Sequence, residues 1–250
     1  MGATCLIPVY NEKDRIAQVL RVVLKVKNIE QVLCVDDGST DGTARYIRQN
    51  WPKVQVVEMS GNQGKAAAIK HGLRFVKNES VLLMDADLQG LNKAELEMAV
   101  TSFVDNKGVD MLILRRMNSP WFVKFYRSDI LLSGERLVKK NDLEQILAGQ
   151  VERYQLEVAI NNYMLRHHKQ VRWLPCSALN TYKVQKWGKL DGSFKELKMY
   201  ADIVTYVGLL NMVLQLTSFA TKRLDTGGAH KLPVKTFRAI LVLAGAAANY

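Results

Sequence analysis

Short apolar stretches alternate with amphipathic stretches over residues 1–115 of the chain. The apolar stretches are rich in β-branched residues, which is typical of strands buried on both faces; they cover residues 4–9, 31–35, 54–59, 81–84 and 110–114. The amphipathic stretches have the period of a helix and cover residues 15–27, 43–50, 65–76 and 93–106. This alternation predicts βαβ units, and therefore an α/β fold with a Rossmann-like, mostly parallel sheet flanked by helices.

The pattern is mixed after residue 132. Helical pieces around residues 133–136 and over 154–166 precede a strand-like run at 171–174. The end of the chain predicts two amphipathic helices that are separated near Gly227. We therefore expect one large domain over residues 1–190 and a helical C-terminal segment over 191–250.

The stretch 203–221 has no charged residue and is long enough to consider as a membrane span. Polar side chains such as Asn211 and Gln215 interrupt it, so we do not predict a spanning helix. Two alternatives stay open: the segment packs on the domain, or it lies in a membrane interface. Basic residues flank the predicted helices, at Lys195, Lys198, Lys222, Arg223, Lys231, Lys235 and Arg238.

Composition excludes several classes of protein. An apolar content of 48% excludes intrinsic disorder, and a mean hydropathy of -0.08 excludes a polytopic membrane protein. The start of the chain has no basic region or cleavage site before its first apolar stretch, so we expect no secretory leader. Cys5, Cys34 and Cys176 match no zinc or redox motif, which predicts buried, reduced thiols and a cytoplasmic location.

The net charge of +11 favours an anionic partner. Nucleic acid, phosphorylated metabolites and an anionic membrane surface are the candidates. The basic residues are dispersed and form no recognised nucleic-acid module, so we expect no nucleic-acid partner.

The chemistry-bearing residues follow the predicted strands. Ligands of open parallel sheets bind beyond the carboxyl ends of the strands. Polar loops follow four strands, at residues 10–12, 36–42, 60–65 and 85–89. The first loop has no glycine-rich turn, and Glu12 would repel a pyrophosphate there, which argues against a dinucleotide-dependent dehydrogenase.

Asp85 and Asp87 leave one strand end on the same side, because alternate side chains of a strand point the same way. Two such carboxylates repel each other unless a cation neutralises them. Gln89 adds a neutral oxygen, and oxygen ligands suit Mg²⁺ or Mn²⁺. An exposed acidic turn is the alternative. The pair Asp36 and Asp37 ends another strand, where a carboxylate could accept hydrogen bonds from a base N–H or ribose hydroxyls.

Four motifs occur in order: IPVYNE at 7–12, VDDGSTDGT at 35–43, GNQGKAAA at 61–68 and DADLQ at 85–89. With them the chain resembles the family-2 glycosyltransferases of the GT-A fold, and most of all the dolichol- and polyprenyl-phosphate sugar synthases. The resemblance covers residues 3–140 well. It implies a nucleotide-diphosphate sugar as donor, inversion at the anomeric carbon, and Mg²⁺ or Mn²⁺ as cofactor.

The resemblance also implies roles for particular residues. The nucleoside would be held by Pro8, Tyr10, Glu12, Val35 and Asp37. The rest of the donor would contact Lys65, Asp85 and Ala86, and the metal would be held by Asp85, Asp87 and Gln89. Arginines that recognise phosphate in the donor or acceptor would be Arg116, Arg127 and Arg136, since guanidinium groups match phosphate oxygens; pairing with surface carboxylates is the alternative for each.

The acceptor decides whether a general base is needed. A lipid phosphate is already an anionic nucleophile, whereas a hydroxyl has to lose a proton. Glu157 is the candidate base for a sugar or small hydroxyl acceptor. Residues 90–92 depart from the His-Pro-Pro usual in the lipid-phosphate synthases. We expect a lipid acceptor and a peripheral enzyme that binds the cytoplasmic face of an anionic membrane. A soluble enzyme is the alternative. The sequence indicates neither the sugar, the nucleotide nor the oligomeric state.

Overall fold

A seven-stranded sheet forms the centre of the computed structural model, which describes residues 2–118, 128–149, 156–180, 214–215, 218–219 and 222–225. The strand order is β3-β2-β1-β4-β7-β6-β8. The strands are β1 (Ala3–Val9), β2 (Ile29–Asp36), β3 (Gln55–Glu58), β4 (Ser80–Leu83), β6 (Met111–Arg116), β7 (Arg136–Lys139) and β8 (Val171–Cys176). A small second sheet pairs β5 (Leu88–Gln89) with β9 (Leu179–Asn180).

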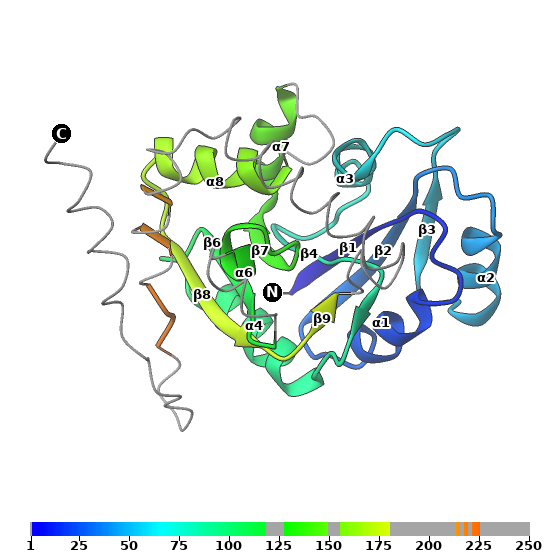
Figure 1. Cartoon of the computed structure of the whole chain (residues 1–250), viewed down its shortest axis with the longest axis horizontal. Coiled ribbons are helices and arrows are strands. Elements are labelled where there is room, and N and C mark those ends of the chain that lie inside the picture. Colours follow the sequence, from blue (N-terminus) through cyan, green and yellow to red (C-terminus); the bar gives the residue numbers. More distant parts are fainter. Residues whose placement is uncertain are drawn as a thin grey trace, which may run out of the picture.

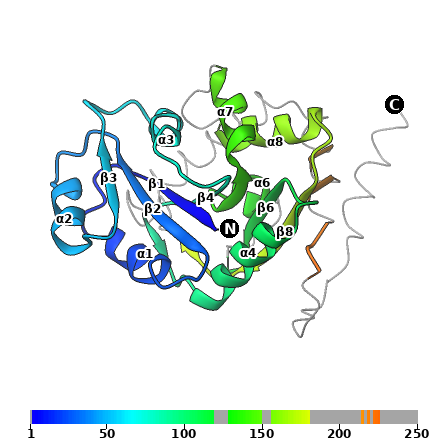
Figure 2. The ribbon, with the colours of Figure 1, turned by 180° about the vertical axis from the view of Figure 1, so that it is seen from behind.

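Helices cover both faces of the large sheet (Figures 1 and 2). One face carries α1 (Ile16–Val23), α2 (Thr43–Asn50) and α4 (Lys93–Asp105). The other carries α3 (Lys65–Leu73), α6 (Ser128–Leu131), α7 (Lys140–Ala148) and α8 (Leu156–Arg166). Alternate residues of β1 enter the two cores: Cys5 and Ile7 face α1, whereas Leu6 faces α3. The two-residue period of a strand produces this division.

The register brings the predicted loops to one edge. Val9 pairs with Asp36, and Asp36 pairs with Glu58, so β1, β2 and β3 end together. β4 runs parallel to β1 and ends beside it. The expected α/β fold with a mostly parallel sheet is therefore confirmed.

Two predictions about strands were wrong. β7 was expected among helical pieces, but it is a strand that pairs antiparallel with β4 and β6. It begins at Arg136, a charged residue that is fully buried, so the hydrophobic pattern does not show it. β3 was expected to be buried on both faces, but it is an edge strand whose residues are half-buried or exposed.

The described part of the C-terminal segment packs on the domain. Trp173 in β8 donates its backbone N–H to Lys222 O at 3.2 Å, and Leu224 N donates to Trp173 O at 3.0 Å. Phe219 and Leu224 are buried. The proposed boundary at residue 190 and most of the predicted helices lie outside the described residues. In the parts of the chain that the structure describes, no helix combines the length and apolarity needed to cross a membrane.

Candidate active site

The loops after β1 and β2 are fastened to each other. Asn11 lies in the left-handed region with a φ of 54°, which asparagine tolerates better than most residues. Its Oδ1 accepts hydrogen bonds from Thr40 N at 2.9 Å and Asp41 N at 3.3 Å, and its own N–H donates to Ser39 Oγ at 2.9 Å. The segment that was expected to hold a nucleoside is therefore preformed.

Asp37 fastens the next loop. Its two carboxylate oxygens accept hydrogen bonds from Gln63 N and Gly64 N, both at 2.7 Å. Gly38 has a φ of 74°, and a Cβ there would lie 2.6 Å from the Cα of Gly61. A glycine is required at this position both by the backbone conformation and by the close approach of the two loops. The role of Asp37 towards a nucleoside stays a prediction.

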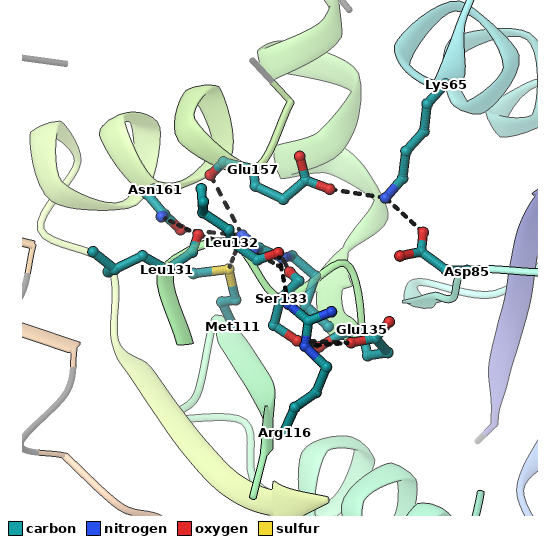
Figure 3. A network of polar contacts seen from close by, with 11 residues as sticks. Lys65, Asp85, Met111, Arg116, Leu131, Leu132, Ser133, Glu135, Glu157 and Asn161 are labelled. Atoms are coloured by element: carbon teal, nitrogen blue, oxygen red, sulfur yellow. Dashed lines mark hydrogen bonds and ion pairs between the residues drawn. The ribbon is translucent and has the colours of Figure 1, made fainter. Parts of the chain in front are cut away.

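Lys65 occupies the centre of the site, between two carboxylates (Figure 3). Its Nζ lies 2.6 Å from Asp85 Oδ1 and 2.8 Å from Glu157 Oε1. Lys65 begins α3, Asp85 follows β4, and Glu157 lies in the first turn of α8. Three segments that are distant in the sequence thus place two negative groups around one ammonium group.

The charges of this cluster support one another. Burial alone would lower the pKa of Lys65, but the charges of Asp85 and Glu157 outweigh burial and raise it. Burial alone would raise the pKa of Asp85, but the charge of Lys65 and its hydrogen bond lower it. Lys65 is therefore protonated and Asp85 ionised at neutral pH.

Glu135 lies beneath this cluster and was not among the predicted site residues. It is fully buried, and its Oε2 accepts a hydrogen bond from Ser133 Oγ at 2.9 Å. Arg116 Nε lies 3.8 Å from the same oxygen. Burial raises the pKa of Glu135, although the charge of Arg116 opposes the rise. The signal in the sequence was the run SGER at 133–136, from which only Arg136 was given a role.

Arg116 is placed where it can act on the site. Its side chain is 11% exposed, and its charge helps to lower the pKa of Asp85. Its Nη2 donates to Leu132 O at 3.4 Å. The structure therefore brings Arg116 close to Asp85, and its contact with donor phosphates stays a prediction.

Arg136 is not placed to meet a substrate, which corrects the sequence prediction. It is fully buried. Its guanidinium group donates hydrogen bonds to Ser133 O, to Leu131 O and to Asn161 Oδ1. A cation so completely enclosed and bonded holds the fold together rather than binding an acceptor. Arg127 lies outside the described residues.

Two further residues that were predicted to contact the donor have buried side chains. Val35 is fully buried in the core between the sheet and α3, and Ala86 is 5% exposed. Tyr10, by contrast, is 44% exposed at the end of β1, and Pro8 is half-buried.

The acidic residues suit a metal that is shared with a substrate. Among the described residues, no group of three or more His, Cys, Asp or Glu side chains could hold a metal ion alone. Asp85 is engaged with Lys65, Asp87 is half-buried and Gln89 is exposed. Mg²⁺ is commonly bound by one or two carboxylates together with substrate phosphates. Asp87 fits that kind of site, with Gln89 nearby in β5.

Arg15 is a further residue that the sequence reasoning missed. Its Nε donates to Glu12 Oε2, and its Nη2 donates to Asn11 O at 3.2 Å. The hydrogen bond to Glu12 raises the pKa of Arg15, and the charges of Glu12 and Asp87 add to the rise. Arg15 therefore faces the loop edge between the first and fourth strands. Its spacing after Glu12, three residues along a helical turn, was the available signal.

Comparisons with known proteins identify the family of this chain. The sequence pattern of "Glycosyl transferase family 2" matches residues 4–179. An uncharacterised glycosyltransferase of Synechocystis is 34% identical over 34% of this chain and 29% of its own length. The undecaprenyl-phosphate 4-deoxy-4-formamido-L-arabinose transferase of Proteus mirabilis is 31% identical over 48% of this chain and 39% of its own length. The chain thus spans less than half the length of these relatives.

Solved structures show the same fold. Glucosyl-3-phosphoglycerate synthase from Mycobacterium tuberculosis, in complex with Mn²⁺, UDP and phosphoglyceric acid, superposes with a TM-score of 0.61 at 15% identity. The match covers 83% of this chain and 78% of that one. Staphylococcus aureus TarS superposes with a TM-score of 0.56 at 20% identity, covering 70% and 58% of the two chains. The GT-A fold is confirmed, and the chain belongs to glycosyl transferase family 2.

Proposed function

We propose that this glycosyltransferase moves a sugar from a nucleotide-diphosphate sugar to a polyprenyl phosphate, with inversion at the anomeric carbon. The observation that carries the proposal is the Lys65 ammonium group between Asp85 and Glu157, at the loop edge of the sheet, with Arg116 close enough to lower the pKa of Asp85. The named relatives that act on undecaprenyl phosphate support the choice of acceptor.

The donor would lie across the loops after β1, β2 and β4. Tyr10 and Glu12 would face the nucleoside, and the buried Asp37 would hold the neighbouring loop through Gln63 N and Gly64 N. Lys65 and Arg116 would face the diphosphate, where cationic groups stabilise the negative charge that develops on the leaving nucleoside diphosphate. Positive side chains at this edge thus act on the bond that breaks.

A divalent ion would be held by Asp87, with oxygen from Gln89 and from the donor diphosphate. When bound, Mg²⁺ or Mn²⁺ would further neutralise the leaving group. The structural neighbour solved with Mn²⁺ and UDP supports a metal of this kind.

Transfer would proceed by a single displacement. An oxygen of the acceptor phosphate attacks the anomeric carbon, while the bond from that carbon to the diphosphate oxygen breaks and its electron pair leaves with the nucleoside diphosphate. The attacking phosphate oxygen is already anionic, so this chain need not remove a proton. Glu157, paired with Lys65, then orients the ammonium group instead of acting as a base.

A lipid acceptor implies work at a membrane. We infer a peripheral enzyme on the cytoplasmic face, with basic residues facing anionic lipids; each contributes about 1 kcal/mol near the surface. The net charge of +11 supports this inference. Binding to anionic vesicles should fall as salt is raised, and a protein that stays in solution at low salt would contradict it.

The acceptor is tested by offering both chemistries. The full chain is incubated with UDP-, GDP- and dTDP-sugars, Mn²⁺, and either a polyprenyl phosphate in detergent or simple sugar and glycerol acceptors. Mass spectrometry identifies the product. We expect a glycosyl-phosphoryl lipid, and we expect Glu157→Gln to retain measurable transfer because glutamine still accepts a hydrogen bond from Lys65.

Transfer only to hydroxyl acceptors, abolished in Glu157→Gln, would favour the alternative enzyme in which Glu157 is the general base. The proposed function would be contradicted if the protein neither hydrolyses any of these donors nor transfers sugar from any of them.

A further inference from the structure

A buried polar network extends from the active site towards the C-terminal segment. It starts at Arg136, which is fully buried at the beginning of β7. Its Nε donates to Ser133 O at 2.9 Å, and its Nη1 reaches Glu157 O at 3.5 Å. Arg136 therefore connects the loop that carries Glu135 to the turn of α8 that carries Glu157.

Asn161 continues the network one helical turn further along α8. It is fully buried. Its Oδ1 accepts a hydrogen bond from Arg136 Nη1 at 3.0 Å, and its Nδ2 donates to Leu131 O at 3.0 Å. Figure 3 shows Asn161 and Glu157 on the same helix, with Leu131 between this helix and the SGER loop.

Gln215 closes the network from the C-terminal segment. It is 2% exposed. Its Oε1 accepts a hydrogen bond from Asn161 Nδ2 at 3.2 Å, and its Nε2 donates to Asn162 Oδ1 at 2.9 Å. A side chain more than fifty positions away in the sequence thus bonds directly to the residue that orients Arg136.

The same segment is anchored at the edge of the large sheet. Arg223 forms a parallel bridge with Trp173 of β8, and its guanidinium group lies 5.8 Å from the Trp173 ring centre. Arg115 lies 5.1 Å from the same ring. Phe219 is buried in the core that α8 also covers. These contacts keep Gln215 against α8.

We propose that the segment around Gln215 is a positioning element of the active site. Through Asn161 and Arg136 it fixes the first turn of α8, where Glu157 holds Lys65 beside Asp85. The inference rests on the proposed function for its kinetic consequence. The network itself is a property of the fold, because each buried polar group depends on the next for a hydrogen-bond partner.

The test compares two substitutions of one side chain in the full chain. Gln215→Met keeps the length of the side chain but removes both hydrogen bonds. Gln215→Glu keeps an oxygen that accepts from Asn161. Ser218→Ala is the matched control, because it removes a hydrogen bond of the same segment, from Ser218 Oγ to Leu214 O at 2.6 Å, that does not reach α8.

We expect Gln215→Met to lower kcat about tenfold while the KM for the sugar donor changes less than about threefold, since the loops that hold the nucleoside are untouched. Gln215→Glu should recover part of kcat, and Ser218→Ala should match the wild type. A wild-type kcat in Gln215→Met, or an equal loss in Ser218→Ala, would overturn the inference.

Hydrogen exchange gives a readout that needs no activity. Gln215→Met should speed the exchange of backbone amides at 157–161 and leave α1 at its wild-type rate. Unchanged exchange at 157–161 would overturn the inference even if the wild type transfers no sugar. A wild type that transfers no sugar would by itself contradict only the proposed function.

Discussion

At the scale of single residues, the site depends on how closely the backbone approaches Asp85. Lys65 and Glu157 are 92 positions apart, yet one ammonium group serves both Glu157 and Asp85. This arrangement needs the carboxylate of Asp85 to stay in one place. Gly134 provides the surface against which it rests, because a Cβ there would lie 2.5 Å from Asp85 Oδ2.

Gly134→Ala should therefore displace Asp85 and weaken donor binding about tenfold, with a loss of stability of about 1–3 kcal/mol from overpacking. Calorimetric titration with a nucleoside diphosphate and urea unfolding would measure the two effects. Gly149→Ala is the matched control, because a Cβ there meets its nearest atom at an ordinary 3.7 Å. Equal donor affinity in both variants would mean that Gly134 does not position Asp85.

Sequence reasoning identified the residues at strand ends but not their surroundings. Asp85 and Lys65 were predicted as site residues because they lie in polar motifs, and Glu157 was predicted as the candidate base; the structure brings the three together. Arg136 was predicted as a phosphate ligand because a sequence does not show burial. Glu135 was missed for the same reason: a carboxyl group looks solvated until the fold encloses it.

At the scale of elements, the departure of residues 90–92 from the His-Pro-Pro pattern has a local explanation. Asn92 is the N-cap of α4, and its Oδ1 accepts hydrogen bonds from Ala94 N at 2.8 Å and Glu95 N at 3.4 Å. Glu95 then accepts from Ser177 N at 2.7 Å, which holds the strand pair β5 and β9. The cap thus supports the loop after Asp87.

Asn92→Ala should destabilise the protein by about 1 kcal/mol, because two N–H groups at the start of α4 lose their acceptor. Asn92→Asp keeps an acceptor oxygen and should stay close to the wild type. Urea unfolding at neutral pH measures both. A loss in the aspartate variant as large as in the alanine variant would show that the cap is not the cause.

Helices and parallel strands were predicted from periodicity, whereas β7 was not. The repeating strand and helix periods mark β1, β2, β4 and their helices, since each has a sustained apolar face. β7 has only four residues and begins with a charge, so its pairing with β4 depends on contacts from outside its own segment.

At the scale of the whole molecule, stability depends on keeping three thiols neutral. Cys5, Cys34 and Cys176 are buried and free, as predicted. Burial raises the pKa of Cys5 and of Cys34, and it raises the pKa of Cys176 to about 12. In the unfolded chain a thiol ionises near pH 8.5. Above that pH the unfolded state therefore binds fewer protons than the folded state.

The neutral thiols should therefore make their full contribution to the free energy of unfolding below about pH 8.5. Above that pH the free energy of unfolding should fall by about 1.4 kcal/mol per pH unit for each thiol, until the pKa of the thiol in the folded state is reached. Cys176→Ala should make this fall less steep by about 1.4 kcal/mol per pH unit, up to about pH 12. Urea unfolding at about pH 8, 9 and 10 gives the slope of the free energy of unfolding against pH. An unchanged slope in Cys176→Ala would show that this thiol is not protected.

The central claim is that a nucleoside diphosphate binds at the loop edge with a divalent ion on Asp87. Calorimetric titration of UDP and GDP in the presence of Mn²⁺ tests it most directly, in the wild type, in Asp87→Asn and in the exposed control Asp105→Asn. We predict that one of the two nucleotides binds to the wild type and the control, and that Asp87→Asn weakens binding about tenfold or more. Equal affinity in all three proteins, or binding of neither nucleotide, would contradict the account.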